Sequence, residues 1–187
     1  MKYLKNLSIA IITLLFITSC SDDDTPIVVV EEEVITTMTI TLTPIGGGTP
    51  IIMQTKDLDG DGPGAPVVTN PVILAANSIY NASIELLNEL ESPAEDITEE
   101  VEELDKEHQF FFQASNAIAT FAYADIDDDG NPVGLSFTLT TGTAGTGTVT
   151  VILVHEPIKD ASGVSDGDRT NAGGEEDIRQ TFNVVVQ

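Results

Sequence analysis

The fold is predicted from one stretch, Val34-Ile35-Thr36-Thr37-Met38-Thr39-Ile40-Thr41-Leu42, in which two kinds of side chain alternate. One set of alternate positions, from Val34 to Leu42, is mostly apolar, whereas the other set holds Ile35 and three threonines. Because successive side chains of a strand point to opposite faces, this alternation predicts a β-strand with one buried face. Pro44 and the three glycines that follow end the strand, and residues 51–55 are expected to form its hairpin partner.

Further short apolar stretches follow, separated by residues that favour turns. The predicted strands lie at residues 80–86, 109–112, 117–124, 135–140, 146–154 and 181–186. Residues 56–66 are rich in Gly, Pro and Asp and are expected to form a loop. About seven or eight short strands with such turns predict an all-β, immunoglobulin-like β-sandwich for residues 34–187. A small β-barrel is the alternative, and the length suits a single domain with its own core.

One segment, residues 92–107, does not follow the strand pattern. The sequence Ser92-Pro93-Ala94-Glu95 is typical of a helix start, with serine at the cap, proline in the first turn and glutamate placed for a capping box. Four residues then fall on one helical stripe: Ile97, Val101, Leu104 and His108. We expect a short acidic helix that crosses between the sheets, and an acidic loop is the alternative.

The N-terminus has the features of a lipoprotein signal. Residues 1–19 begin with two lysines and continue with an apolar run that is shorter than the ~20 residues of a membrane-spanning helix. The run ends in Ile17-Thr18-Ser19-Cys20, which reads as a lipobox, and Cys20 is the only cysteine of the chain. We therefore expect lipid on Cys20, which would anchor the protein to a membrane, and an acidic linker over residues 20–33. The alternative is an uncleaved N-terminal anchor.

Two resemblances extend this interpretation. The opening Cys-Ser-Asp-Asp-Asp at residues 20–24 resembles that of Bacteroidetes-type lipoproteins, which implies an outer-membrane lipoprotein of the cell envelope, periplasmic or displayed on the surface. Residues 107–112, 163–168 and 171–175 resemble small flavobacterial lipoproteins often labelled "type 1 periplasmic binding fold superfamily". That second resemblance covers nearly the whole chain but implies no site. The fold of that label is a larger doubly wound α/β structure, whereas nothing in this chain alternates strands with long helices.

The charge of the chain limits its partners. Its formal net charge is −24, and it becomes −26 without residues 1–19, which hold two lysines and no acidic residue. A chain this acidic is repelled by nucleic acid and by anionic lipid head groups, so no nucleic-acid partner is expected. It can attract cations or a basic protein surface. The hydrophobic share of 41% is ordinary for a globular domain.

Two loops share the spacing Asp-x-Asp-x-Asp-Gly. Their aspartates are Asp57, Asp59 and Asp61 in the first loop, and Asp125, Asp127 and Asp129 in the second. Alternate carboxylates of this kind can converge on one calcium ion. An EF-hand is excluded, because the twelfth loop position holds Val68 or Ser136 instead of glutamate. A calcium loop on a β scaffold is the hypothesis, and plain exposed turns are the alternative.

The two histidines form a second candidate site. His108 opens one predicted strand and His155 ends another, and each lies where the apolar face of its strand reaches the rim. If the two strand ends meet, both imidazoles and a carboxylate from Glu107 or Glu156 could bind zinc or copper. The alternative is a pair of half-buried histidines that bond to backbone carbonyls.

Catalytic motifs are lacking, so we expect a protein that is not an enzyme. No serine lies in a nucleophile elbow, and the glycines at 142–147 lack the lysine of a phosphate-binding loop. The sequence predicts a lipid-anchored binding or accessory module that binds cations, with calcium favoured, or docks an envelope partner such as an outer-membrane transporter. A purely structural surface lipoprotein without a ligand is the alternative.

Overall fold

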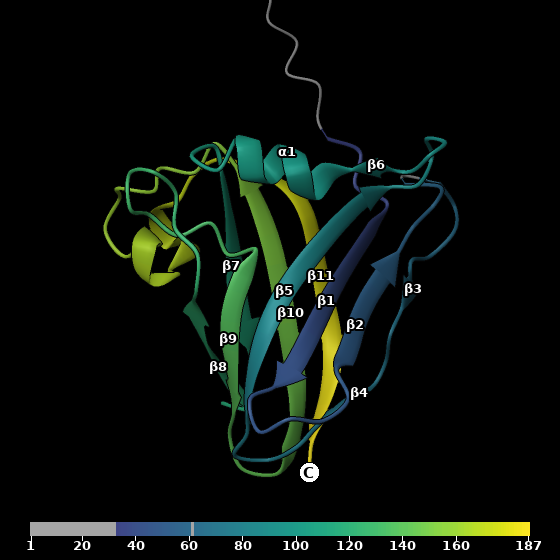
Figure 1. The fold of residues 1–187 in the computed structure, drawn as a ribbon, viewed down its shortest axis with the longest axis vertical. Coiled ribbons are helices and arrows are strands. Elements are labelled where there is room, and N and C mark those ends of the chain that lie inside the picture. The colour runs from purple at the N-terminus through teal and green to yellow at the C-terminus, as the bar shows by residue number, and fades with distance from the viewer. Residues whose placement is uncertain (1–32, 61) are drawn as a thin grey trace, which may run out of the picture. The chain divides into compact units, whose positions relative to one another are not determined.

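The computed structural model describes residues 33–60 and 62–187, which form two β-sheets and one short α-helix (Figure 1). The strands of the first sheet are β1 (Thr37–Pro44), β2 (Ile51–Lys56), β3 (Val67–Val68), β5 (Ile79–Asn88), β6 (Glu95–Asp96), β8 (Ala119–Tyr123) and β9 (Ser136–Thr141). Those of the second are β4 (Val72–Leu74), β7 (His108–Ala114), β10 (Gly145–His155) and β11 (Glu175–Val186). The helix α1 spans Ile97–Glu103, and two 3-10 helices span Val164–Asp166 (η1) and Arg169–Asn171 (η2).

The seven-stranded sheet has the order β3-β2-β1-β5-β9-β8, with β6 paired to β5, and the four-stranded sheet has the order β4-β11-β10-β7. The predicted hairpin of β1 and β2 is confirmed, with Met38 opposite Thr55 and Leu42 opposite Ile51. All pairings within the two sheets are antiparallel except that of β4 with β11. The edge strands β8 and β7 end their sheets on the same side of the molecule (Figure 1).

The main core lies between the two sheets, so the all-β sandwich prediction is confirmed and the closed barrel is excluded. The alternation predicted for residues 34–42 is realised within β1, since Met38, Ile40 and Leu42 are buried with at most 1% exposure. The predicted start at Val34 is wrong, because β1 begins at Thr37 and Val34 is 50% exposed. β10 is buried on both faces: Val151 and Leu153 pack in the main core, whereas Ile152 and Val154 lie in a second cluster. That second cluster is made of Phe111, Ile152, Val154, Val164 and Ala172, so the segment with η1 and η2 covers the outer face of the smaller sheet.

The strand count exceeds the predicted seven or eight. The additional strands β3, β4 and β6 have only two or three residues each, which is too short to show a period of two in the sequence. Among residues 33–60 and 62–187, no helix is long and apolar enough to cross a bilayer. Cys20, the signal at 1–19 and most of the linker at 20–33 lie outside the described residues.

The predicted helix exists, but its predicted start is wrong. Glu95 and Asp96 pair with the end of β5, and the Asp96 side chain caps the helix by accepting from the amide of Thr98 at 3.0 Å. Pairing with β5 satisfies the backbone before Ile97, so the helix cannot begin at Ser92. Ile97 and Val101 are buried as the stripe predicted. The helix lies across one end of the two sheets (Figure 1).

Candidate metal centre

The two histidines meet at the end of the smaller sheet that α1 covers. His108 opens β7 and His155 ends β10, and the two residues are direct partners in the antiparallel register. Their rings stack with centroids 4.9 Å apart and planes inclined by 8°. The strand ends therefore meet as the zinc hypothesis required, although the carboxylates near His108 are not those that the sequence suggested.

His108 is fully buried and its orientation is set by the backbone. Its Nδ1 lies 3.1 Å from the carbonyl oxygen of Leu104, the residue that caps α1. Because a carbonyl oxygen only accepts, Nδ1 carries the hydrogen and donates it. The other ring nitrogen, Nε2, then faces Oε1 of Glu33 at 3.1 Å. In a neutral ring this would set a nitrogen lone pair against a carboxylate, so the contact requires a cation between the two atoms, either a proton or a metal ion.

Glu33 and Asp177 complete the centre. One ligand atom from each of Glu33, His108 and Asp177 lies within 4.8 Å of the others. It is the one such group of three among residues 33–60 and 62–187. The Glu33 side chain is 9% exposed, and its Oε2 is buried without a hydrogen-bond partner. Carboxylate and imidazole groups that converge below the surface are a donor set for a divalent cation.

A β-bulge places Asp177 in this centre. In the pairing of β10 with β11, Leu153 faces Ile178 but Val154 faces Glu176, so Asp177 is the extra residue of β11. A bulge re-aims the side chain at which it occurs, and bulges are frequent beside functional sites. Because of the bulge, the Asp177 side chain does not follow the regular alternation of side chains along β11. No pattern in the sequence marks it.

The charges at the centre shift the pKa values of its groups in a consistent direction. The hydrogen bond with His108 lowers the pKa of Glu33, and this effect outweighs burial, which acts in the opposite direction. Burial lowers the pKa of His108, but the hydrogen bond and charge of Glu33, together with the Leu104 carbonyl and the charge of Asp177, outweigh burial and raise it. Both shifts mean that the site favours positive charge next to the Glu33 carboxylate.

The other carboxylates of the zinc hypothesis lie apart from this centre. Glu107 Oε2 is 3.8 Å from Nε2 of His155, which is longer than a hydrogen bond. Glu156 is exposed, and its amide donates to the carbonyl of Glu107 at 2.6 Å. Sequence reasoning therefore identified His108 but missed Glu33, which it took for part of the linker, and Asp177. His155, which the zinc hypothesis also included, stacks on His108 but does not belong to the group of three. The acidic run before the first strand was a signal for Glu33, although nothing singled out this residue within it.

A lysine side chain forms an ion pair with the second aspartate loop. Asp127 is buried, and its Oδ2 accepts from Lys159 Nζ at 3.0 Å while its Oδ1 accepts from the amides of Asp129 and Asn131. Lys159 also donates to the carbonyl oxygens of Asp105 and Pro132. The ammonium group thus lies among the oxygen atoms that a bound cation would otherwise need.

The remaining aspartates of that loop face other partners. Asp125 accepts from the amides of Gly134 and Ser136, each at 2.7 Å, and Asp129 pairs with Lys106 at 3.0 Å. The expected convergence of Asp125, Asp127 and Asp129 on one point is therefore not found. The physical reason is that each carboxylate already has other partners: backbone amides for Asp125, and a lysine for each of Asp127 and Asp129.

The first aspartate loop can be described only in part, because Asp61 lies outside the described residues. Asp57 Oδ1 accepts from the amide of Asp59 at 3.2 Å, and Asp59 Oδ2 accepts from the amide of Gly64 at 2.9 Å. These are the side-chain bonds of a loop that is closed by its own aspartates. Calcium binding by Asp57, Asp59 and Asp61 stays a prediction.

Comparisons of the chain with protein-family models, with curated proteins and with solved structures find no match. The resemblance to small flavobacterial lipoproteins therefore stays a prediction.

Proposed function

We propose that this protein is a lipid-anchored, non-catalytic module of the cell envelope that binds a divalent transition-metal ion, with zinc as the expected ion. The observation that carries the proposal is the convergence of Glu33, His108 and Asp177, with Glu33 Oε2 buried and without a hydrogen-bond partner.

The donor set supports a transition metal over calcium. Calcium takes six to eight oxygen ligands, whereas zinc accepts an imidazole nitrogen with carboxylate oxygens in a four-coordinate site. Two ligands of a tetrahedral zinc ion at ~2.0–2.1 Å lie about 3.3 Å apart. The 3.1 Å between His108 Nε2 and Glu33 Oε1 is close to this value. The bond from Nδ1 to the Leu104 carbonyl is the supporting contact that zinc-binding histidines usually make.

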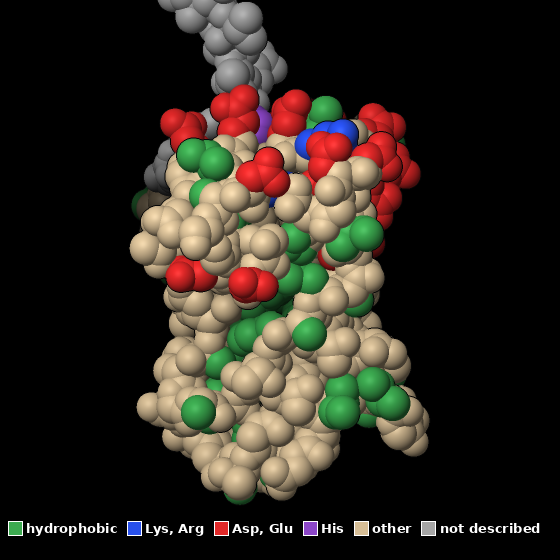
Figure 2. Space-filling model, turned by 90° about the vertical axis from the view of Figure 1, so that its left-hand side faces the viewer, with side chains coloured by type: hydrophobic (Ala, Val, Ile, Leu, Met, Phe, Trp, Pro, Cys, Tyr) green, Lys and Arg blue, Asp and Glu red, His purple; other side chains and the backbone are tan. Residues whose placement is uncertain are grey.

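Electrostatics of the surrounding surface support the capture of a cation. Residues 95–107 hold eight acidic side chains. Figure 2 shows acidic side chains gathered at the end of the molecule where a histidine is visible, and few at the opposite end. A surface of one sign raises the local concentration of counter-ions and speeds their association. Three protein ligands also leave a fourth position for water or for a group of an envelope partner.

The proposed ion would fasten the start of the domain to the sheet. Glu33 is the last residue of the predicted linker, whereas His108 opens β7 and Asp177 belongs to β11. An ion held by all three would tie the segment that leads from the lipid to two strands of the smaller sheet. Binding would then stabilise the folded domain at the end where the predicted linker joins it.

Zinc is expected to stabilise the full chain selectively. A ligand that binds only the folded state adds about 2.7 kcal/mol at ~100 times its Kd, which raises the Tm of a domain of this size by roughly 5–10 °C. The measurement is thermal unfolding of the metal-stripped full chain, purified in detergent and titrated with zinc, calcium or magnesium at constant ionic strength. We expect a rise in Tm with zinc and only the general effect of salt with magnesium.

Matched variants test whether the rise comes from this centre. Glu33→Gln and Asp177→Asn keep the size of each side chain but remove its charge, and each should abolish the zinc response. Glu107→Gln removes a carboxylate that lies beside His155 instead, and it should keep the response. A response that persists in Glu33→Gln, or the absence of any response to zinc, would overturn the metal proposal. The contact between His108 and Glu33 would then be a proton-mediated pair of a structural lipoprotein.

The membrane anchor is tested at Cys20. In cells that process lipoproteins, the chain should be recovered in the membrane fraction, and Cys20→Ser should move it to the soluble fraction because serine cannot carry the thioether-linked lipid. Ser21→Ala is the control, and it should leave the distribution unchanged. Membrane recovery of Cys20→Ser equal to that of the unaltered chain would point instead to an uncleaved N-terminal anchor.

A further inference from the structure

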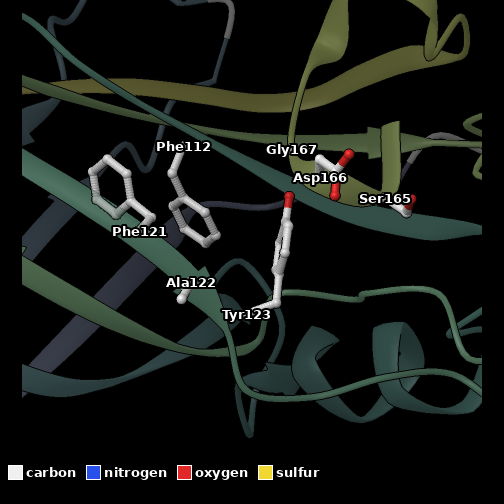
Figure 3. A pocket seen from close by; sticks show the side chains of 7 residues that line it. All are labelled: Phe112, Phe121, Ala122, Tyr123, Ser165, Asp166 and Gly167. Carbon is white, nitrogen blue, oxygen red and sulfur yellow. The ribbon is translucent and has the colours of Figure 1, made fainter. Parts of the chain in front are cut away.

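A second candidate site lies on the side of the sandwich where β7 and β8 are the edge strands. An open hollow of about 280 Å³ is lined by Phe112, Phe121, Ala122, Tyr123, Ser165, Asp166 and Gly167. Figure 3 shows the rings of Phe112, Phe121 and Tyr123 along one part of it and the segment Ser165–Gly167 near the hydroxyl end of Tyr123. Figure 2, which views this side, shows hydrophobic side chains exposed along the middle of the surface.

The rings of the hollow belong to a cluster that holds half of the ten aromatic side chains of the chain. Phe112 lies 5.3 Å from Phe121, 5.9 Å from Tyr123 and 4.1 Å from Phe137, measured between ring centroids, and 6.4 Å from Phe110. Phe110 and Phe137 are buried, whereas Phe112, Phe121 and Tyr123 are only half-buried. The planes of Phe112 and Phe121 are inclined by 23°, and those of Phe112 and Tyr123 by 53°. The hollow thus has aromatic walls in different orientations.

The ring of Tyr123 lines the hollow, whereas its hydroxyl group already has hydrogen-bond partners within the protein. The hydroxyl donates to the carbonyl of Phe110 at 2.6 Å and accepts from Gln109 Nε2 at 3.2 Å. Burial raises the pKa of Tyr123 to about 12, so the phenol stays neutral in the physiological range. Tyr123 therefore does not act as an acid, a base or a phenolate ligand.

The charge of the hollow comes from Asp166. Its side chain is exposed at the rim, and no lysine or arginine of the described part of the chain lines the hollow. The aromatic faces carry a negative quadrupole potential, and the chain as a whole has a net charge of −24. Anions are disfavoured here, whereas a cation with an apolar surface would gain from the rings and from the carboxylate together. The volume is at the lower end of ligand sites, so it suits a small head group.

From this combination we infer that the hollow between β7 and β8 binds a small organic cation with an alkylated ammonium group. The rings of Phe112, Phe121 and Tyr123 contact its methyl groups, and Asp166 lies beside its charge. This inference does not depend on the metal centre, which involves none of these residues.

The test uses two probes of the same shape and different charge. Tetramethylammonium or choline is titrated into the full chain and followed through the NMR signals of the aromatic rings, and the neutral isostere 3,3-dimethylbutan-1-ol is titrated in parallel. We expect saturable shifts of the Phe112, Phe121 and Tyr123 signals with choline and at least threefold weaker binding of the neutral alcohol. Equal affinity for the two probes, or no saturable shift with choline, would overturn the inference.

Variants measure separately how an aromatic ring and the Asp166 carboxylate contribute to choline binding. Phe121→Leu keeps an apolar side chain but removes one aromatic face, and binding of choline should weaken roughly threefold to thirtyfold. Asp166→Asn changes only an exposed group and serves where Phe121→Leu fails to fold, and it should also weaken choline binding but leave the alcohol unaffected. Asp128→Asn, an exposed aspartate outside the hollow, is the control and should bind choline like the unaltered chain. Unchanged choline affinity in Asp166→Asn would contradict the role given to the carboxylate.

Discussion

Replacing Lys159 with methionine is expected to lower the free energy of unfolding by about 3–5 kcal/mol, because it leaves the buried carboxylate of Asp127 without its partner. The side chains of both residues are at most 5% exposed, and Lys159 is the only basic side chain that Asp127 contacts among the described residues. Two carbonyl oxygens, of Asp105 and Pro132, also lose their donor. Such a loss is a large fraction of the stability of an ordinary domain. Urea unfolding of the full chain, followed by circular dichroism, measures it.

Lys106→Met is the matched control for Lys159→Met. Lys106 pairs with Asp129 of the same loop, but the two side chains are 50% and 65% exposed, so its removal should change the stability by less than about 1 kcal/mol. A double variant, Lys159→Met with Asp127→Asn, should recover part of the loss because it removes the uncompensated charge. Equal effects of Lys159→Met and Lys106→Met would contradict the buried ion pair.

The dependence of stability on pH is a second test of the pair formed by Asp127 and Lys159. Burial raises the pKa of Asp127, but Lys159 and the amides of Asn131 and Asp129 outweigh burial and lower it. A carboxyl whose pKa is lowered by folding adds stability above its unfolded pKa and loses it as the pH falls through the folded pKa. The difference in stability between the unaltered chain and Lys159→Met should therefore be full at neutral pH and shrink as the pH falls and the Asp127 carboxyl becomes protonated.

Replacing Gly174 with alanine is expected to lower the free energy of unfolding by about 2–5 kcal/mol, from a left-handed backbone and a steric overlap together. Gly174 has φ of +69°, and an added Cβ would overlap the carbonyl oxygen of His155, a backbone atom at the end of β10. Relief of the overlap requires the backbone of β10 or β11 to move. Because Glu175 pairs with His155 and Asp177 is close behind it, the metal centre should be disturbed as well.

Gly173→Ala separates the two contributions. Gly173 has φ of +61°, but its added Cβ would lie 3.6 Å from the side chain of Ile158, an ordinary contact. Its cost should be about 1–2 kcal/mol from the backbone alone. Thermal or urea unfolding of the two variants measures the difference, and zinc titration of Gly174→Ala reports on the centre. Equal costs for the two glycines would mean that the overlap at Gly174 is relieved without strain.

Patterns of local origin could be predicted from the sequence. Strand β1 and its hairpin with β2 follow from alternation and turn residues, and the sandwich follows from the repetition of such strands. The buried pair Ile97 and Val101 follows from helical spacing. These features depend on side chains a few residues apart, which is the range over which periodicity carries information.

The start of α1 could not be predicted from neighbouring residues alone. The side chain of Ser92 could cap a helix, but Glu95 and Asp96 pair with β5 instead. The backbone of these two residues is therefore extended, and the helix begins after them. The aspartate loop is a similar case. Its spacing matches half of a calcium loop, yet Lys159, 30 residues or more away in the chain, supplies the positive charge.

The sequence by itself determined the all-β sandwich and the place of each histidine at the end of a core face. Only the tertiary structure decided which groups meet there. Glu33 and His108 are 75 residues apart, and a one-residue bulge in β11 orients Asp177 toward them. Long-range contacts of this kind depend on strand register and on chain packing, and neither leaves a period in the sequence.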